Sequence, residues 1–223
     1  MFILYNYYNN YKLLSYINRI YSMFNLFQST SVKWTWIFIV ISILGFVFQQ
    51  VFSPNIWIFL AFVPAFSIKF PWMFITSIFL HADLSHLFFN MFSLFFFGIY
   101  LEKIIGSKSF VSLFIGSGIA GNIGYMLTTY NALTPSIGAS GAVYGIIGTL
   151  TTLQPFMMIF VYGLLPLPMI ALAVMYAFAD LIGLFSPSGI AHGAHLAGML
   201  IGVAYGLILR SRFKRMVLEN YSY

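Results

Sequence analysis

The sequence predicts an all-α membrane protein, and three observations support that fold class: its composition, its long apolar stretches and the placement of its basic residues. Of the 223 residues, 61% are hydrophobic and only 6% are charged. A soluble domain carries about a quarter charged residues. Because so few charges cannot cover a surface that faces water, we expect the bilayer to be the main solvent. The length fits one compact domain.

Six apolar stretches are candidates for membrane-spanning helices, which need about 20 residues each. The fourth is interrupted by Gln154-Pro155. If it ends there, it is too short to cross a bilayer alone and starts well below the membrane surface. The expected spans are roughly 34–52, 74–100, 110–128, 140–154, 168–185 and 190–209.

The segments outside these spans are a first loop and two tails. Three prolines exclude a single spanning helix over 53–73, and its Trp57 and Trp72 suit the membrane interface. We therefore expect a structured loop that lies partly in the membrane. The expected division of the chain is an interfacial or cytoplasmic N-terminal tail over 1–33, a six-helix core over 34–210 and a basic cytoplasmic tail over 211–223.

The net charge of +6 comes from basic residues that flank the apolar stretches and form no single patch. Such placement is typical of topology signals and speaks against nucleic-acid binding. With six spans, nine of the ten basic residues fall on one side of the membrane and only Lys69 on the other. This asymmetry predicts that both termini are cytoplasmic, and we expect the cell (plasma) membrane.

Polar side chains within the expected spans are the functional candidates, because such groups are costly in a bilayer. In "HADLSHLFFN", His86 and Asn90 are four residues apart and share a helix face, and His81 precedes them. These groups could also serve only as hydrogen-bonding glue between helices. The further candidates are Asp83, Asn122, Ser140, Asp180, His192 and His195.

Two rows of glycine at four-residue spacing predict that the fourth and sixth spans pack closely. Small residues at this spacing let helix backbones approach each other, although the rows could serve packing alone. Close packing would bring a serine and a histidine at the facing helix ends within hydrogen-bond reach. The rows are Gly141 and Gly145 in the fourth span, and Gly198, Gly202 and Gly206 in the sixth.

Serine becomes a useful nucleophile when a base, usually a neutral histidine, takes its proton. Ser140 opens a helix, so its own N–H lacks an intrahelical acceptor and is free to stabilise an oxyanion. His86 and Asn90 offer further donors. Asp180 could be proposed as a third, acidic member, but its place in the sequence gives no reason to prefer it. A two-residue dyad is the simpler hypothesis.

A metal centre and an aspartyl dyad are weaker hypotheses. The four histidines could bind zinc together with a carboxylate, and the chain has no cysteine for a Cys-type zinc site. The HExxH motif is absent, however, and a zinc protease needs its glutamate as base. An aspartyl dyad would require Asp83 and Asp180 to meet, and neither lies in a glycine-rich motif. We therefore expect no metal and no cofactor.

The motifs "HADLSHLFFN", "GASGAVYG" and "AHLAGMLIG", in this order on successive spans, resemble the rhomboid family of intramembrane serine proteases over roughly residues 70–206. The resemblance implies a six-transmembrane-helix bundle with a membrane-associated first loop. It implies that Ser140 is the nucleophile and His195 the general base. His86 and Asn90 match the oxyanion group.

The same resemblance assigns supporting roles. Tyr144 matches a tyrosine that stacks on the base, and His81 matches a structural histidine that helps to hold water near the site. His192 lies outside the motif and is interpreted as a loop or access residue. Trp72-Met73 stands where the family often has Trp-Arg, and Glu102 matches a family glutamate that could tie a loop down. The supporting glycines are Gly138, which lets the chain turn into the fourth span, and Gly141, Gly198 and Gly202, which let the sixth span approach.

The leading functional hypothesis is an intramembrane serine endopeptidase that cleaves transmembrane helices with helix-destabilising residues near one end. An inactive rhomboid relative of the derlin type, which binds membrane proteins without cutting them, is the alternative. Such relatives lack the serine and the histidine that this chain keeps. A transporter or channel would predict inverted repeats, and none is found. The expected partners are transmembrane substrates and the bilayer, and no pattern indicates an oligomeric state.

Overall fold

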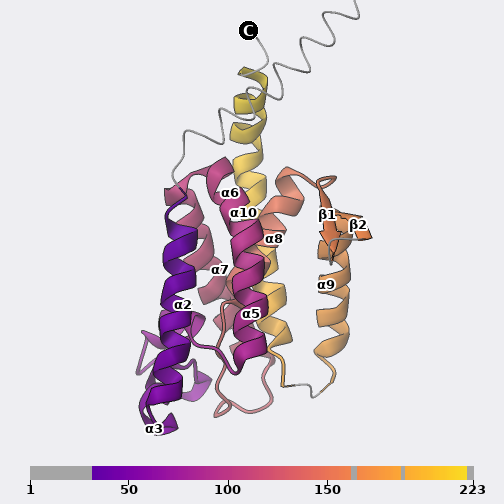
Figure 1. Cartoon of the computed structure of the whole chain (residues 1–223). Helices are drawn as coiled ribbons and strands as arrows, with labels where there is room; N and C mark the ends of the chain where they lie inside the picture. The colour runs from indigo at the N-terminus through magenta and orange to yellow at the C-terminus, as the bar shows by residue number, and fades with distance from the viewer. Residues whose placement is uncertain (1–31, 162–164, 187–188, 220–223) are drawn as a thin grey trace, which may run out of the picture.

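The computed structural model describes residues 32–161, 165–186 and 189–219, and in this part of the chain the architecture is mostly helical (Figure 1). The expected N-terminal tail lies outside the described residues up to residue 31. In Figure 1 the long helices stand side by side as a bundle. The main helices are α2 (Trp34–Val51), α5 (Leu84–Ser93), α6 (Ile99–Ile105), α7 (Ser107–Thr128), α8 (Ser140–Leu153), α9 (Met169–Gly183) and α10 (His192–Glu219).

Within the described residues, four helical stretches are long and apolar enough to cross a membrane. They are Trp34–Val51, Leu84–Ile105, Ser107–Thr128 and His192–Ser211, and the apolar helices α8 and α9 are shorter. Of the six predicted spans, four therefore correspond to helices of full length, and the other two correspond to the shorter helices α8 and α9. The expected end of the fourth span near Gln154 agrees with the end of α8 at Leu153.

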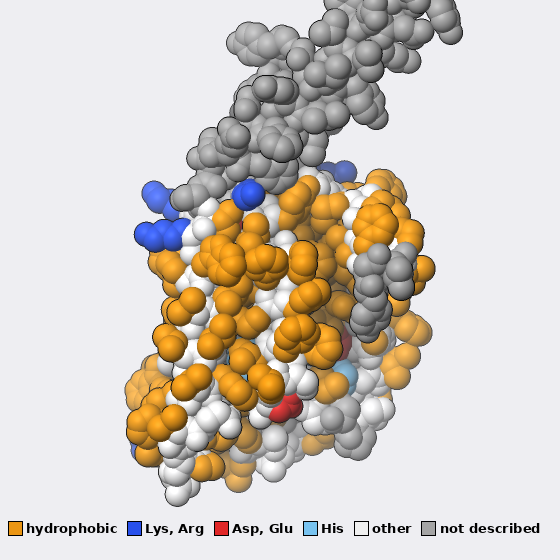
Figure 2. Space-filling view, in the orientation of Figure 1, with side chains coloured by type: hydrophobic (Ala, Val, Ile, Leu, Met, Phe, Trp, Pro, Cys, Tyr) orange, Lys and Arg blue, Asp and Glu red, His pale blue; other side chains and the backbone are white. Residues whose placement is uncertain are grey.

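An apolar outer surface surrounds these helices. Figure 2 shows hydrophobic side chains over most of the visible face, with Lys and Arg side chains gathered at the end where α2 begins. Many large apolar side chains of α2, α5 and α9 are exposed, as expected when lipid rather than water surrounds a helix. The chain is thus an integral membrane protein built from helices.

The second expected span begins later than predicted. Residues from 73 onward form two short turns of helix, α4 (Met73–Thr76) and η3 (Ser77–Phe79), before α5 starts at Leu84. Asp83 caps α5, because its Oδ1 accepts a hydrogen bond from the His86 backbone N–H at 2.8 Å. A hydrogen bond from the Ser85 hydroxyl lowers the pKa of this exposed carboxyl, which keeps the cap charged. The helix then continues through a π-helical segment, η4 (Leu94–Gly98), into α6.

The first loop consists of short helical turns, as its prolines predict. They are α3 (Pro54–Trp57), η1 (Ile58–Leu60) and η2 (Pro64–Phe66). The Trp72 indole N–H donates to the Phe59 carbonyl oxygen at 2.9 Å. Met73, where the family often has arginine, is only 2% exposed and packs with Phe62 and Val63. An apolar cluster therefore holds residue 73 in place where the family often has an arginine.

Glycines allow α8 and α10 to pack backbone against backbone, and α7 contacts both of these helices. A Cβ atom on Gly198 would overlap the carbonyl oxygen of Gly141, and one on Gly202 would overlap that of Gly145. The Thr149 hydroxyl lies 2.9 Å from the Gly202 carbonyl oxygen and ties the two helices together. This contact fixes how the start of α8 faces the start of α10.

A β-hairpin between α8 and α9 was not predicted. Its strands β1 (Met158–Val161) and β2 (Leu165–Pro168) pair antiparallel, with Met158 opposite Pro168 and Val161 opposite Leu165. The apolar run that encodes it has no polar alternation to mark strands. The hairpin lies at the end of the bundle where α8 ends (Figure 1).

Candidate active site

Ser140 is held at the start of α8 by the loop that precedes it. Gly138 has a φ of 129°, a backbone conformation that favours glycine, and its N–H donates to the Ser77 carbonyl oxygen at 2.9 Å. A Cβ atom on Gly138 would overlap the ring of His86. The sequence expectation that Gly138 turns the chain into the helix thus has a geometric basis, and the same glycine makes room for His86.

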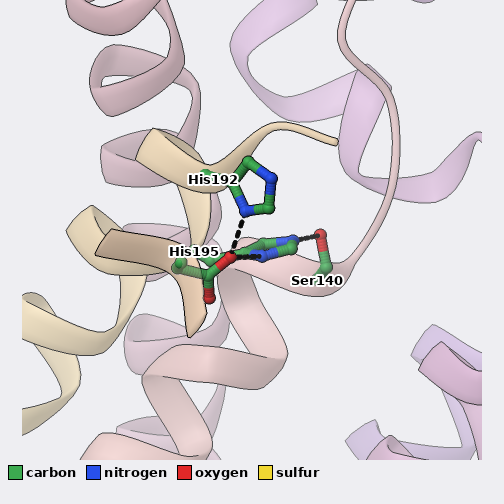
Figure 3. Close-up of polar contacts among 4 residues, drawn as sticks. Ser140, His192 and His195 are labelled. Carbon is green, nitrogen blue, oxygen red and sulfur yellow. Dashed lines mark hydrogen bonds and ion pairs between the residues drawn. The ribbon is translucent and has the colours of Figure 1, made fainter. Parts of the chain in front are cut away.

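His195 lies in the first turns of α10 and faces Ser140. Its Nε2 is 2.9 Å from the Ser140 Oγ, and a dashed line in Figure 3 marks this contact. The ring of Tyr144, one turn along α8, lies nearly parallel to the His195 ring, with 4.3 Å between centroids and 16° between planes. The contact between α8 and α10 therefore brings together a hydroxyl, an imidazole and a flat aromatic support.

Asp180, near the end of α9, is the acidic group that sequence reasoning did not place. Its Oδ1 lies 2.9 Å from the Nδ1 of His195 and 2.6 Å from the Nδ1 of His192 (Figure 3). The Asp180 side chain is 5% exposed, and both histidine side chains are 13% exposed. Its Oδ2 is buried without a hydrogen-bond partner among the described residues. The Tyr144 hydroxyl is a near neighbour of this carboxylate.

His192 is therefore more than a residue of the loop, because it shares a carboxylate oxygen with His195. Gly183 makes this possible, since a Cβ atom there would overlap the His192 ring. A local sequence pattern could not reveal the cluster, because Asp180 belongs to a different helix from the two histidines. The signal in the sequence was a single acidic residue in an apolar helix.

The other predicted polar residues lie on the α5 side of the site. His86 borders the same cavity as Ser140 and His195. The Asn90 amide donates to the His86 carbonyl oxygen at 2.9 Å. Asn90 is buried and is not among the residues that line the cavity. His81 is fully buried, with its ring centroid 5.2 Å from that of His86. Neither ring nitrogen of His81 has a hydrogen-bond partner among the described residues.

A cavity of about 900 Å³ opens onto the serine. Its walls come from the segment around Ala82, from the loop before α8, and from the turn between α9 and α10. Polar groups converge on it, including Ser136, His86 and His192. A cavity of this size has room for an extended stretch of peptide and for water.

Taken together, these groups offer the parts of an acyl-transfer site: a hydroxyl, a base in hydrogen-bond contact and a carboxylate behind the base. The first backbone amides of α8 lack intrahelical acceptors and point out of the N-terminus of the helix, where the Ser140 hydroxyl lies. Three residues of this site, Asp180, His192 and His195, are also potential metal ligands. The donor atoms of Asp180, His192 and His195 all lie within 4.8 Å of one another.

Comparisons with known proteins agree with a helical membrane fold and indicate the family. The sequence model of the Rhomboid domain matches residues 69–212. The chain is 33% identical over 143 residues to the mitochondrial rhomboid protein 1 of Saccharomyces cerevisiae. The aligned region covers 59% of this chain and 40% of that protein. It is 38% identical over 80 residues to the rhomboid protease GluP of Bacillus subtilis, covering 35% of this chain and 15% of that protein.

The name of a third relative describes it as inactive. The inactive rhomboid-like protein 8 of Arabidopsis thaliana is 39% identical over 79 residues, which is 35% of this chain and 22% of that protein. The chain spans less than half the length of each of these three relatives. Because the Rhomboid domain model covers more than half of this chain, including every helix from α5 to α9, the chain belongs to the rhomboid family.

Proposed function

We propose that this protein is an intramembrane serine endopeptidase in which Ser140 is the nucleophile and His195 the general base. The observation that carries the proposal is the 2.9 Å distance between the Ser140 Oγ and the His195 Nε2. That distance is what direct proton transfer from a serine hydroxyl requires. It occurs beside a cavity and at the start of a helix, where a developing negative charge is stabilised.

In the proposed reaction, His195 Nε2 takes the Ser140 proton while Oγ attacks the carbonyl carbon of a substrate peptide bond. The protonated imidazole then gives this proton to the leaving amine, and an acyl-enzyme ester remains on Ser140. A water molecule, deprotonated by the same nitrogen, hydrolyses the ester and restores both side chains. No cofactor is needed for any of these steps.

Asp180 has the position of a residue that orients the base. Its contact with the His195 Nδ1 favours the tautomer in which Nδ1 carries the hydrogen, so that the lone pair of Nε2 faces Ser140. It also stabilises the imidazolium that forms during the reaction. The Tyr144 ring holds the plane of the imidazole from one side. We therefore extend the expected dyad by one positioning residue.

The oxyanion group is proposed to combine the first amides of α8 with the α5 side of the cavity. His86 borders the cavity directly. The Asn90 amide already gives one hydrogen to the His86 carbonyl, and its second hydrogen remains to be donated. We expect Asn90→Ala to lower kcat about 10²–10³-fold with little change in KM, as loss of one oxyanion donor does elsewhere. A change in KM alone would contradict this role.

Substrates are proposed to be transmembrane helices that unwind locally, so that a backbone carbonyl reaches Ser140. The described basic residues at the start of α2, around the turn from α6 to α7 and late in α10 favour a cytoplasmic location for that end of a six-span bundle. The start of α8 is at the other end, so water would enter from the non-cytoplasmic face. The plasma membrane has no support, since relatives include mitochondrial proteins.

Cleavage of a generic transmembrane substrate by the detergent-purified protein tests the proposal. We expect cleavage by the wild type and none by Ser140→Ala. His195→Ala should lose several orders of magnitude in rate. Equal cleavage by wild type and Ser140→Ala would exclude Ser140 as nucleophile. Substrate binding without any cleavage by the wild type would favour the alternative, an inactive rhomboid-like protein that binds membrane proteins without cutting them.

A further inference from the structure

Asp180, His192 and His195 form a cluster of potential metal ligands at the proposed active site. Two imidazole Nδ1 atoms converge on one carboxylate oxygen, at 2.6 and 2.9 Å. Neutral imidazole and carboxylate form a common ligand set for Zn²⁺ and similar divalent transition ions. The donors come from two different helices, α9 and α10, which fixes them relative to each other.

We propose that this cluster binds a divalent transition-metal ion such as Zn²⁺, and that the bound ion switches the protease off. The proposal names a regulator of the proposed active site and rests, for its inhibitory part, on the proposed function. It does not make the metal a cofactor of the reaction. Nothing in the catalytic steps above requires an ion.

The geometry needs only a small change to accept the ion. Zinc bonds to nitrogen and oxygen are about 2.0–2.2 Å, so neighbouring ligand atoms of a tetrahedral site lie roughly 3.4 Å apart. The two Nδ1–Oδ1 distances must therefore widen by less than about 1 Å, as the ion replaces the hydrogens between these atoms. All three donor atoms already lie within 4.8 Å of one another.

A second observation points to a ligand for this cluster. Asp180 is almost fully buried, yet its Oδ2 has no hydrogen-bond partner among the described residues. The Tyr144 hydroxyl is the near neighbour of this carboxylate, and a bound cation would add the charge compensation that a buried carboxylate needs. The approach to the cluster is open, because His192 and His195 both line the cavity.

The chemistry explains why binding would inhibit. In a neutral imidazole one nitrogen carries the hydrogen and the other has the lone pair. When the His195 Nδ1 gives its lone pair to the ion, its hydrogen must reside on Nε2. The Nε2 atom then donates toward Ser140 and cannot accept the hydroxyl proton. Removal of the ion restores the reactive tautomer.

Metal binding is tested on the inactive Ser140→Ala protein, without a polyhistidine tag, so that the result is independent of proteolysis. Zn²⁺ is titrated in competition with a chromophoric chelator, and Co²⁺ absorption reports the ligand geometry. We expect one equivalent to bind, with affinity at least about tenfold weaker after a further His192→Ala or Asp180→Asn change. Asp83→Asn, which removes an exposed carboxylate outside the cluster, is the matched control and should bind normally. Absence of binding, or equal binding after His192→Ala, would overturn the proposal.

Inhibition is tested on the active protein. We expect Zn²⁺ to suppress cleavage by the wild type, EDTA to restore it, and the residual cleavage by His192→Ala to be at least about tenfold less sensitive to Zn²⁺. Metal binding without loss of cleavage would overturn the inhibitory role. If Ser140→Ala binds the ion but the wild type cleaves nothing, the proposed protease function fails while the metal site stands.

Discussion

Two buried carboxylates of this protein have opposite surroundings. Glu102, in α6, accepts hydrogen bonds from the backbone amides of Lys33, Trp34 and Thr35 and from the hydroxyls of Thr35 and Ser107, at 2.7–3.2 Å. Asp180 bonds two imidazoles through one oxygen and leaves the other oxygen without a hydrogen-bond partner among the described residues. The first carboxylate is saturated with donors, and the second is not.

The difference separates an acid with a structural role, Glu102, from an acid in contact with reactive side chains, Asp180. Glu102 satisfies the orphan amides at the N-terminus of α2 and interacts favourably with its dipole, so it ties the start of the first helix to the α6–α7 turn. Its partners do not titrate near neutral pH. Asp180 instead contacts two side chains that can exchange protons and bind metals. Burial and charge are common to both, and the partners decide the role.

Replacing Asp180 by Asn gives the largest effect expected within this comparison. The amide keeps the volume but allows the His195 tautomer with its hydrogen on Nε2, so we expect kcat to fall by up to about 10⁴-fold. Kinetic assays measure the loss, and nitrogen-15 shifts of the histidine rings report the tautomer. A variant that is destabilised but keeps the wild-type tautomer and turnover per folded molecule would make Asp180 a structural acid like Glu102.

His192→Ala tests which partner of Asp180 matters for turnover. The substitution leaves the Asp180 contact with His195 in place, so we expect kcat to fall by less than about tenfold. The comparison is made with His195→Ala in the same cleavage assay. A greater loss in His192→Ala than in His195→Ala would reverse the assignment of the base.

Glu102→Gln is expected to have the smallest effect on turnover. The amide nitrogen of glutamine cannot accept the backbone hydrogen bonds, and loss of these charge-assisted bonds lowers the free energy of unfolding by about 2–3 kcal/mol. The thermal midpoint in detergent should fall, while turnover per folded molecule stays within about twofold. An unchanged midpoint combined with a large loss of turnover would remove the distinction between the two acids.

Hydropathy and spacing predicted the parts of the fold that depend on local sequence. The start of α2, the start of α8 at Ser140 and the end of α8 near Gln154 all follow from apolar length and from helix breakers. The second span was placed too early, because residues 74–83 are apolar but form short turns before the Asp83 cap. The hairpin at Met158–Pro168 was missed because both strands are apolar on both faces.

The candidate site was predictable where motifs carry it and unpredictable where helices meet. Ser140 and His195 stand in recognisable patterns, and their glycine rows indicated the contact between α8 and α10. Asp180 has no motif, and only the packing of α9 beside α10 brings it to the histidines. Glu102 shows the same limit, since its partners at the start of α2 are 67 to 69 residues away in the sequence.

The glycine contacts between α8 and α10 also have a consequence for motion. Side chains exchange rotamers within nanoseconds, whereas two packed helix backbones shift against each other far more slowly. Because Gly198 and Gly202 press on the carbonyls of Gly141 and Gly145, the separation between the starts of these helices does not depend on any rotamer. The two backbones therefore keep Ser140 and His195 at a fixed separation. We therefore expect the proposed substrate helices to enter between other helices of the bundle, since the backbones of α8 and α10 are in direct contact.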